Sequence, residues 1–112
     1  MKKYKKCILL KIFINEKERY GKIPLHEWIL KKALEDNMTV LTVVRGVEGF
    51  GTEHKVSTSK ILDLSLNLPL IIEIIDKKKK IKKFVKILNE IIQEGIVATH
   101  EEATVFVYTK KK

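Results

Sequence analysis

A glycine-rich segment that follows an apolar run is the part of this 112-residue chain whose residue types could do chemistry. The run Val40–Val44 ends at Arg45, and Gly46, Gly49 and Gly51 follow it. Glycine permits positive φ and lets a ligand approach the main chain closely. Backbone N–H groups in such a loop can hold an anion, and Arg45 would supply the counter-charge. We therefore predict a site here for a small anionic ligand.

The predicted site also includes a glycine from a distant part of the chain, which would precede the last strand. The predicted ligand-binding residues are Arg45, Gly46, Glu48, Gly49, Gly51 and Gly95. Glu48 would orient Arg45 or accept a hydrogen bond from the ligand. The alternative is a turn in which the glycines serve geometry and Arg45 pairs with Glu48. The spacing leaves both interpretations open, because short glycine motifs often occur by chance.

The other reactive residue types do not form a pattern. Cys7 lies in an apolar run and is typical of a small buried hydrophobe. His26, His54 and His100 lack the spacing of metal ligands. We therefore predict no catalytic residue, no metal ligand and no enzymatic activity, and the sequence specifies no cofactor.

The formal net charge of +9 raises the question of a nucleic-acid partner. Only Arg19 and Arg45 are arginines, however, and arginine is the preferred residue for bidentate phosphate and base contacts. The lysines gather at the termini and on one helix face, which is typical of a solvated surface. The sequence thus argues against a specific nucleic-acid partner. A single cysteine and the lack of a signal peptide or a long apolar run predict a cytoplasmic protein without membrane insertion.

Runs rich in β-branched and aromatic residues predict four strands, and apolar residues at three- and four-residue steps predict two helices. The strands are Lys5–Ile14, Thr39–Arg45, Leu70–Ile75 after Pro69, and a last one over Ile96–Ala98 and Thr104–Tyr108, interrupted at 100–102. Ile61–Leu68 fits either a strand or a helical turn.

The first helix would begin at Pro24 and stop at Asn37, and the second would be capped by Asp76 and ended by Gly95. The expected buried face of the first is Leu25, Trp28, Ile29, Ala33 and Leu34. That of the second is Ile81, Phe84, Val85, Leu88, Ile91 and Ile92.

The element order is β-α-β-β-α-β over a single domain, residues 1–112. The simplest packing is a ferredoxin-like α/β (α+β) sandwich, with a four-stranded antiparallel sheet and both helices on one face. The strands are apolar on both sides, so the second face would be an exposed apolar surface. We therefore expect the chain to self-associate through that face, with Ile72 or Ile74 pointing into the interface.

Several segments together resemble the PII-like family called domain of unknown function 190. They are Leu10–Ile14, Pro24–Glu27, Val44–Gly51, Ile61–Ser65, Asn67–Pro69 and Ile72–Asp76. The resemblance spans about Lys5 to Tyr108, and the Arg-Gly-x-Glu-Gly-Phe-Gly block is its most specific part.

The resemblance implies a PII-like ferredoxin fold and a homotrimer whose sheets line the inside. PII proteins bind adenine nucleotides in clefts between subunits, which here would involve Arg45–Lys60, about Gln93–Glu102 and the C-terminal segment. The PII nucleotide signatures are not present as such. Thr52–Lys60 also has no tyrosine, so uridylylation is not implied.

The function we predict is a PII-like regulatory module that binds a small anionic effector, such as a nucleotide, at clefts between subunits and signals to a partner protein. Two alternatives stay open from the sequence. One is a metal-handling protein or an enzyme on the same trimer, and the other is electrostatic nucleic-acid binding.

Overall fold

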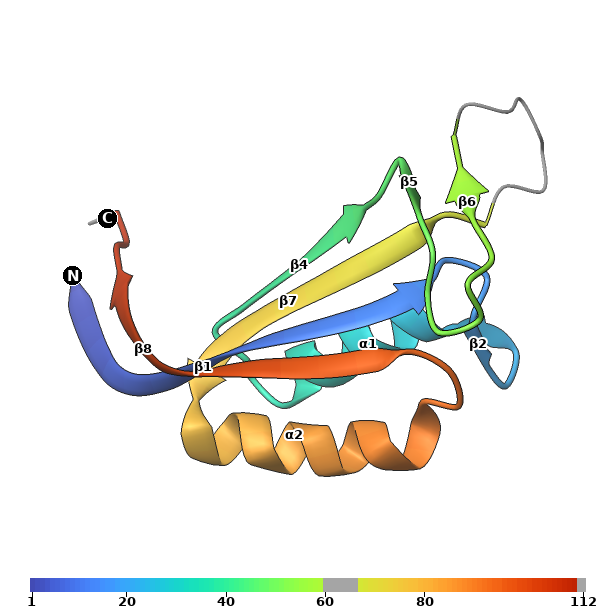
Figure 1. The fold of residues 1–112 in the computed structure, drawn as a ribbon. Coiled ribbons are helices and arrows are strands. Elements are labelled where there is room, and N and C mark those ends of the chain that lie inside the picture. The colour runs from blue at the N-terminus through green and yellow to red at the C-terminus, as the bar shows by residue number, and fades with distance from the viewer. Residues whose placement is uncertain (60–66, 111–112) are drawn as a thin grey trace.

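Four strands form one antiparallel sheet in the order β4-β7-β1-β8 (Figure 1). They are β1 (Lys2–Asn15), β4 (Val40–Arg45), β7 (Pro69–Lys77) and β8 (Ile96–Val107). Two helices, α1 (Leu25–Glu35) and α2 (Lys78–Ile91), lie on one side of the sheet. This computed structural model describes residues 1–59 and 67–110, with only the backbone of 101–102. The predicted ferredoxin-like fold is confirmed.

Two short hairpins complete the described structure. One joins β2 (Arg19–Tyr20) to β3 (Ile23–Pro24), and the other joins β5 (Glu48–Gly49) to β6 (Ser57–Thr58). Of the ambiguous stretch Ile61–Leu68, residues 61–66 lie outside the described residues, and Leu68 is buried.

The core lies between the helices and alternate side chains of the two central strands. The buried residues are Ile8, Leu10, Ile12 and Ile14 from β1, Leu70, Ile72 and Ile74 from β7, and Leu25, Ile29, Ala33, Ile81, Phe84 and Leu88 from the helices. Successive side chains of a strand point to opposite faces, so a single face of each strand meets the helices. Burying one such side chain fully contributes about 1.5–3 kcal/mol.

The first helix departs from its predicted pattern in two places. Pro24 is the N-cap rather than the first helical residue. Leu34, predicted on the buried face, is 70% exposed, because it lies one residue, about 100° of helical rotation, beyond the stripe that ends at Ala33. The chain leaves the helix at Asn37 with φ 54°, which confirms the predicted left-handed stop.

Asp76 does not cap α2, since the N-cap position belongs to Lys77. Instead its buried carboxylate accepts hydrogen bonds from the N–H groups of Thr39 (2.8 Å) and Lys77 (2.7 Å), and Lys80 Nζ lies 3.4 Å away. Burial alone would raise the pKa of Asp76, but these donors together hold it below its usual value. Asp76 thus fastens the start of β4 to the end of β7.

Acid should therefore weaken the fold through Asp76. Because the folded-state pKa is depressed, the stabilisation is present above pH about 4, the unfolded value, and is lost as pH falls through the folded one. We expect Asp76→Asn to lower the free energy of unfolding at pH 7 by about 1–3 kcal/mol and to flatten its fall toward pH 3. Urea unfolding from pH 7 to 3 measures both, with Glu35→Gln on exposed α1 surface as the control. An unchanged pH profile in Asp76→Asn would contradict this role.

Gly95 does not end α2 either. The helix stops at Ile91, and the Ile92 N–H still bonds to the Leu88 carbonyl at 2.9 Å. Gly95 lies three residues later, directly before β8, with φ 147°. Its role is therefore in the turn that starts the last strand.

The sheet face without helices, here called the helix-free face, carries three rows of side chains across the four strands. Opposed residues in the register form two largely apolar rows, Val44–Ile71–Phe13–Ile96 and Val40–Ile75–Leu9–His100. Between them runs a row that we call the polar row, Thr42–Glu73–Lys11–Ala98. The expectation that Ile72 or Ile74 points into an interface is wrong, because both are fully buried under the helices. Ile71 and Ile75 face the open side instead.

The two ends of the chain pair beyond the body of the sheet. Residues 2–4 of β1 pair with residues 105–107 of β8 and form what we call the terminal arm, which curves away from the sheet (Figure 1). Two register shifts separate arm and body, and Lys6 adopts φ 57° there. β8 is continuous, and the interruption predicted at residues 100–102 corresponds to the register shift between the pairs Leu9–His100 and Cys7–Ala103.

Candidate functional site

A cavity of about 650 Å³ lies between the connection from β5 to β6 and the adjacent end of the sheet. Its walls come from residues 46–58, the last residues of β1, the first of β7 and the turn before β8. Five of the six predicted site residues line it, namely Gly46, Glu48, Gly49, Gly51 and Gly95. The structure therefore brings together two segments that lie more than forty residues apart in the sequence.

Arg45, the sixth predicted residue, is not among the residues that line the cavity. Its Nη2 lies 2.8 Å from Glu16 Oε2 and 2.9 Å from Glu16 Oε1. Glu16 Oε1 also accepts the Leu68 N–H at 3.1 Å, and the Glu16 N–H donates to the Leu68 carbonyl at 2.9 Å. The hydrogen bond from Arg45 is the main reason that the pKa of Glu16 falls below its usual value. Arg45 thus holds the end of β4 to Glu16, directly after β1, and Glu16 in turn is bonded to the segment before β7.

Two of the glycines have a geometric reason to be glycine. A Cβ atom on Gly46 would lie 2.9 Å from Pro69 Cγ, and the Gly46 N–H donates to the Pro69 carbonyl at 2.8 Å. A Cβ on Gly95 would lie 2.7 Å from the Phe13 carbonyl oxygen, at a φ that side chains rarely adopt. A Cβ on Gly51 would meet nothing within 4 Å. A Cβ on Gly49 would make an ordinary contact with Pro69 Cγ at 3.4 Å. Gly49 and Gly51 are therefore the predicted site glycines that packing does not explain.

The charge of the cavity wall is mainly negative. Glu18, Glu48, Glu53 and Glu94 line it, and Lys55 is the only basic residue among the described lining residues. A hydrogen bond with Glu53, burial, and the charges of Glu53 and Glu18 together raise the pKa of Glu94. Glu53 and Glu94 fall within the segments that the family resemblance assigned to the cleft, although neither was named as a site residue. Glu18 lies outside those segments, and only the fold brings it to the cavity.

Cys7 lines a smaller cavity, of about 210 Å³, with Asp76 at the opposite end of the sheet. Burial and the charge of Asp76 raise the pKa of the Cys7 thiol, although Lys77 opposes them. A protonated thiol is a poor nucleophile and a poor metal ligand. The described residues contain no group of three or more His, Cys, Asp or Glu side chains placed to hold a metal. No helix in the described part of the chain is long and apolar enough to cross a membrane.

The strand order, the two helices on one face and the loop cavity define a PII-like α/β sandwich, and solved structures agree with it. CPII of Thiomonas intermedia, described as a nitrogen regulatory PII-like protein bound to ADP, AMP and bicarbonate, aligns with a TM-score of 0.65. It is 15% identical and covers 95% of this chain and 100% of its own. A putative PII-like signaling protein of Thermus thermophilus aligns with a TM-score of 0.60 at 14% identity, over 96% and 93% of the two chains.

The chain belongs to the DUF190 family, described as Uncharacterized ACR, whose model matches residues 7–105. A UPF0166 protein of Aquifex aeolicus is 35% identical over 70% of this chain and 74% of its own. A UPF0166 protein of Methanocaldococcus jannaschii is 31% identical over 80% and 82%. A further UPF0166 match from Aquifex aeolicus is 28% identical over 72% and 78%. The family resemblance predicted from the sequence is confirmed.

Proposed function

We propose that the protein is a cytoplasmic, non-enzymatic PII-like regulatory module that binds a small anionic effector at clefts between the subunits of a homotrimer. One observation carries this proposal. Phe13, Ile71 and Ile96 belong to an apolar row of the helix-free face and also line the cavity. A second copy that covers this apolar row would stand directly at the cavity mouth.

The charge of the cavity supports a shared site. An anion needs positive charge close by, yet this chain contributes four glutamates and Lys55 to the lining, while Arg45 is paired with Glu16. Phosphate or carboxylate groups would therefore be neutralised by basic residues of the neighbouring subunit. A neighbouring subunit packed on the helix-free face would place its basic residues next to the cavity.

The likeness to CPII suggests which anions to test first, because that protein was solved with ADP, AMP and bicarbonate. We expect one of these to raise the melting temperature of the trimer, since a ligand that binds only the native state at 100 times its Kd adds about 2.7 kcal/mol of stability. Gly51→Leu should fold normally, because the site of its Cβ is open, and should lose the shift. If neither these ligands nor a wider set of nucleotides and metabolic anions moves the melting temperature, the proposal fails.

Arg45 provides a second test, which separates a ligand contact from a structural one. We expect Arg45→Ala to lower the melting temperature, and Glu16→Ala to lower it at least as much, because Glu16→Ala removes the same ion pair and also the acceptor of the Leu68 N–H. Both should still show the ligand-induced shift, since the Arg45 guanidinium is engaged outside the cavity lining. Differential scanning fluorimetry with and without ligand measures both effects. Loss of the shift in Arg45→Ala with an unchanged melting temperature would instead make Arg45 the counter-charge of the ligand.

A further inference from the structure

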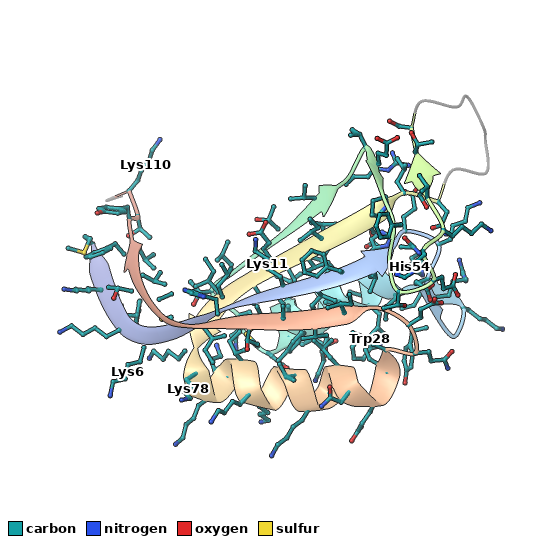
Figure 2. All side chains as sticks on the ribbon, in the orientation of Figure 1. Lys6, Lys11, Trp28, His54, Lys78 and Lys110 are labelled. Carbon is teal, nitrogen blue, oxygen red and sulfur yellow. The ribbon has the colours of Figure 1, made fainter. Side chains whose placement is uncertain are left out.

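Lysines concentrate at the end of the molecule opposite the cavity. Eleven of them lie in residues 1–6 and 77–86, whereas both arginines lie toward the cavity end. The two segments meet in the structure, where Lys77 Nζ lies 5.0 Å from the centroid of the Tyr4 ring. Figure 2 shows Lys6, Lys78 and Lys110 at this end and His54 at the other. Three segments that are distant in the sequence thus bring lysines together at one end of the molecule.

The lysines of α2 follow the helix on its solvent side. Lys78, Lys79, Lys82, Lys83 and Lys86 are all exposed, while the opposite face of the helix is buried in the core. Lys80 differs, because its Nζ is held by the Asn37 carbonyl oxygen and by Asp76. The terminal arm adds Lys2 and Lys3, and the residues next to it in β1 add Lys5 and Lys6; all four are also exposed. We call these nine residues, together with Lys110, the lysine surface.

Aromatic side chains are exposed among these lysines. Phe106, on the terminal arm, is 47% exposed, and Lys3 Nζ lies 5.5 Å from its ring centroid. Tyr108, just beyond the arm, is 76% exposed. Proteins that bind single strands without sequence preference combine positive charge along the backbone with aromatic rings on which bases stack. The lysine surface has both components.

We propose that the lysine surface binds single-stranded nucleic acid without sequence preference. Lysine supplies charge without the bidentate geometry that arginine uses to read bases, so no sequence preference is expected. The terminal arm curves away from the sheet toward the side opposite α2 (Figure 1), so the lysines of the arm and those of α2 do not lie in one plane. A flexible strand can follow both parts, whereas a flat bilayer would touch only one of them. The sequence alone disfavoured this partner, because it could not show that the lysine segments converge.

A fluorescein-labelled 20-nucleotide oligodeoxythymidine is the probe, with binding measured by anisotropy between 50 and 200 mM salt. We expect the logarithm of the binding constant to fall linearly with the logarithm of the salt concentration. The slope should be about −0.7 for each phosphate neutralised. The triple variant Lys3→Gln, Lys79→Gln, Lys82→Gln should lose at least about tenfold in affinity at 50 mM salt and reduce the slope by about 2. Tyr108→Ala should bind about fivefold more weakly with the slope unchanged.

The matched control is Lys17→Gln, Lys22→Gln, Lys31→Gln, which removes the same charge from exposed positions outside both the lysine surface and the cavity lining. It should bind nearly as tightly as the original protein. Equal loss in both triple variants would overturn the proposal, because net charge alone would then explain binding. Failure to bind the oligonucleotide at 50 mM salt would also overturn it. So would tighter binding to vesicles of half phosphatidylglycerol and half phosphatidylcholine through the same lysines, since the partner would then be a bilayer.

Discussion

Gly95→Ala should destabilise the fold by about 3 kcal/mol, a large fraction of the 5–15 kcal/mol typical of a native domain. Two effects act at this position. The backbone has φ 147°, and a new methyl group would lie 2.7 Å from the Phe13 carbonyl oxygen and 2.9 Å from Ile14 Cγ2. Both contacts are with β1, the strand that pairs with β8. Removing these two steric clashes would therefore require the two strands to separate locally.

Gly51→Ala is the matched control for this prediction, because its Cβ would meet nothing within 4 Å. We expect its free energy of unfolding to stay within about 0.5 kcal/mol of the original value. Urea denaturation of both variants, followed by the fluorescence of Trp28, compares them directly. Equal stabilities for the two variants would mean that the turn before β8 adapts to a side chain and that Gly95 is not required by packing.

Val44→Lys should dissociate the proposed trimer into monomers. Val44 lies in an apolar row of the helix-free face and is 42% exposed in the single chain, so lysine is tolerated there before assembly. Within an interface the ammonium group would lose its water without gaining a partner, which costs several kcal/mol per subunit. Analytical ultracentrifugation at micromolar concentration distinguishes the two states.

Leu34→Lys provides the control for the assembly experiment. Leu34 is also apolar and is 70% exposed, but it lies on α1, on the opposite side of the sheet. This variant should keep the mass of the original assembly. If the original protein is itself a monomer, or if both variants dissociate alike, the helix-free face is not the surface that holds the copies together.

The sequence was most informative where local pattern and core packing agree. Runs rich in β-branched and apolar residues predicted β1 and β7, and the stripe Ile81, Phe84 and Leu88 predicted the second helix, because both patterns reflect burial in the core. Leu34 and Asp76 were misread for opposite reasons. Leu34 is apolar but falls just outside the buried stripe. Asp76 is of a residue type that often caps helices, yet its carboxylate accepts hydrogen bonds from the N–H groups of Thr39 and Lys77.

The site was predictable only in part. The glycines were found because their spacing after a strand is a local signal, and the family resemblance supported them. The partner of Arg45 was missed, because Glu16 lies 29 residues away and only the pairing of β1 and β4 with β7 brings the two together. The same holds for Glu18 at the cavity and for the convergence of lysines at the terminal arm. Such contacts depend on the packing of distant segments, which periodicity does not encode.

The polar row on the helix-free face has a consequence for cells that hold more than one such protein, as the two Aquifex aeolicus relatives illustrate. In the proposed trimer, the apolar rows would hold copies together without distinguishing identical chains from related ones, because apolar surfaces of similar shape are interchangeable. Lys11 and Glu73 in the polar row stand opposite each other in the register of β1 and β7. In the proposed trimer this row would differ from the apolar rows, because a facing copy has to present complementary polar groups where water is excluded. Changes confined to this row would let a duplicated gene stop forming mixed oligomers with its parent while both keep the same core.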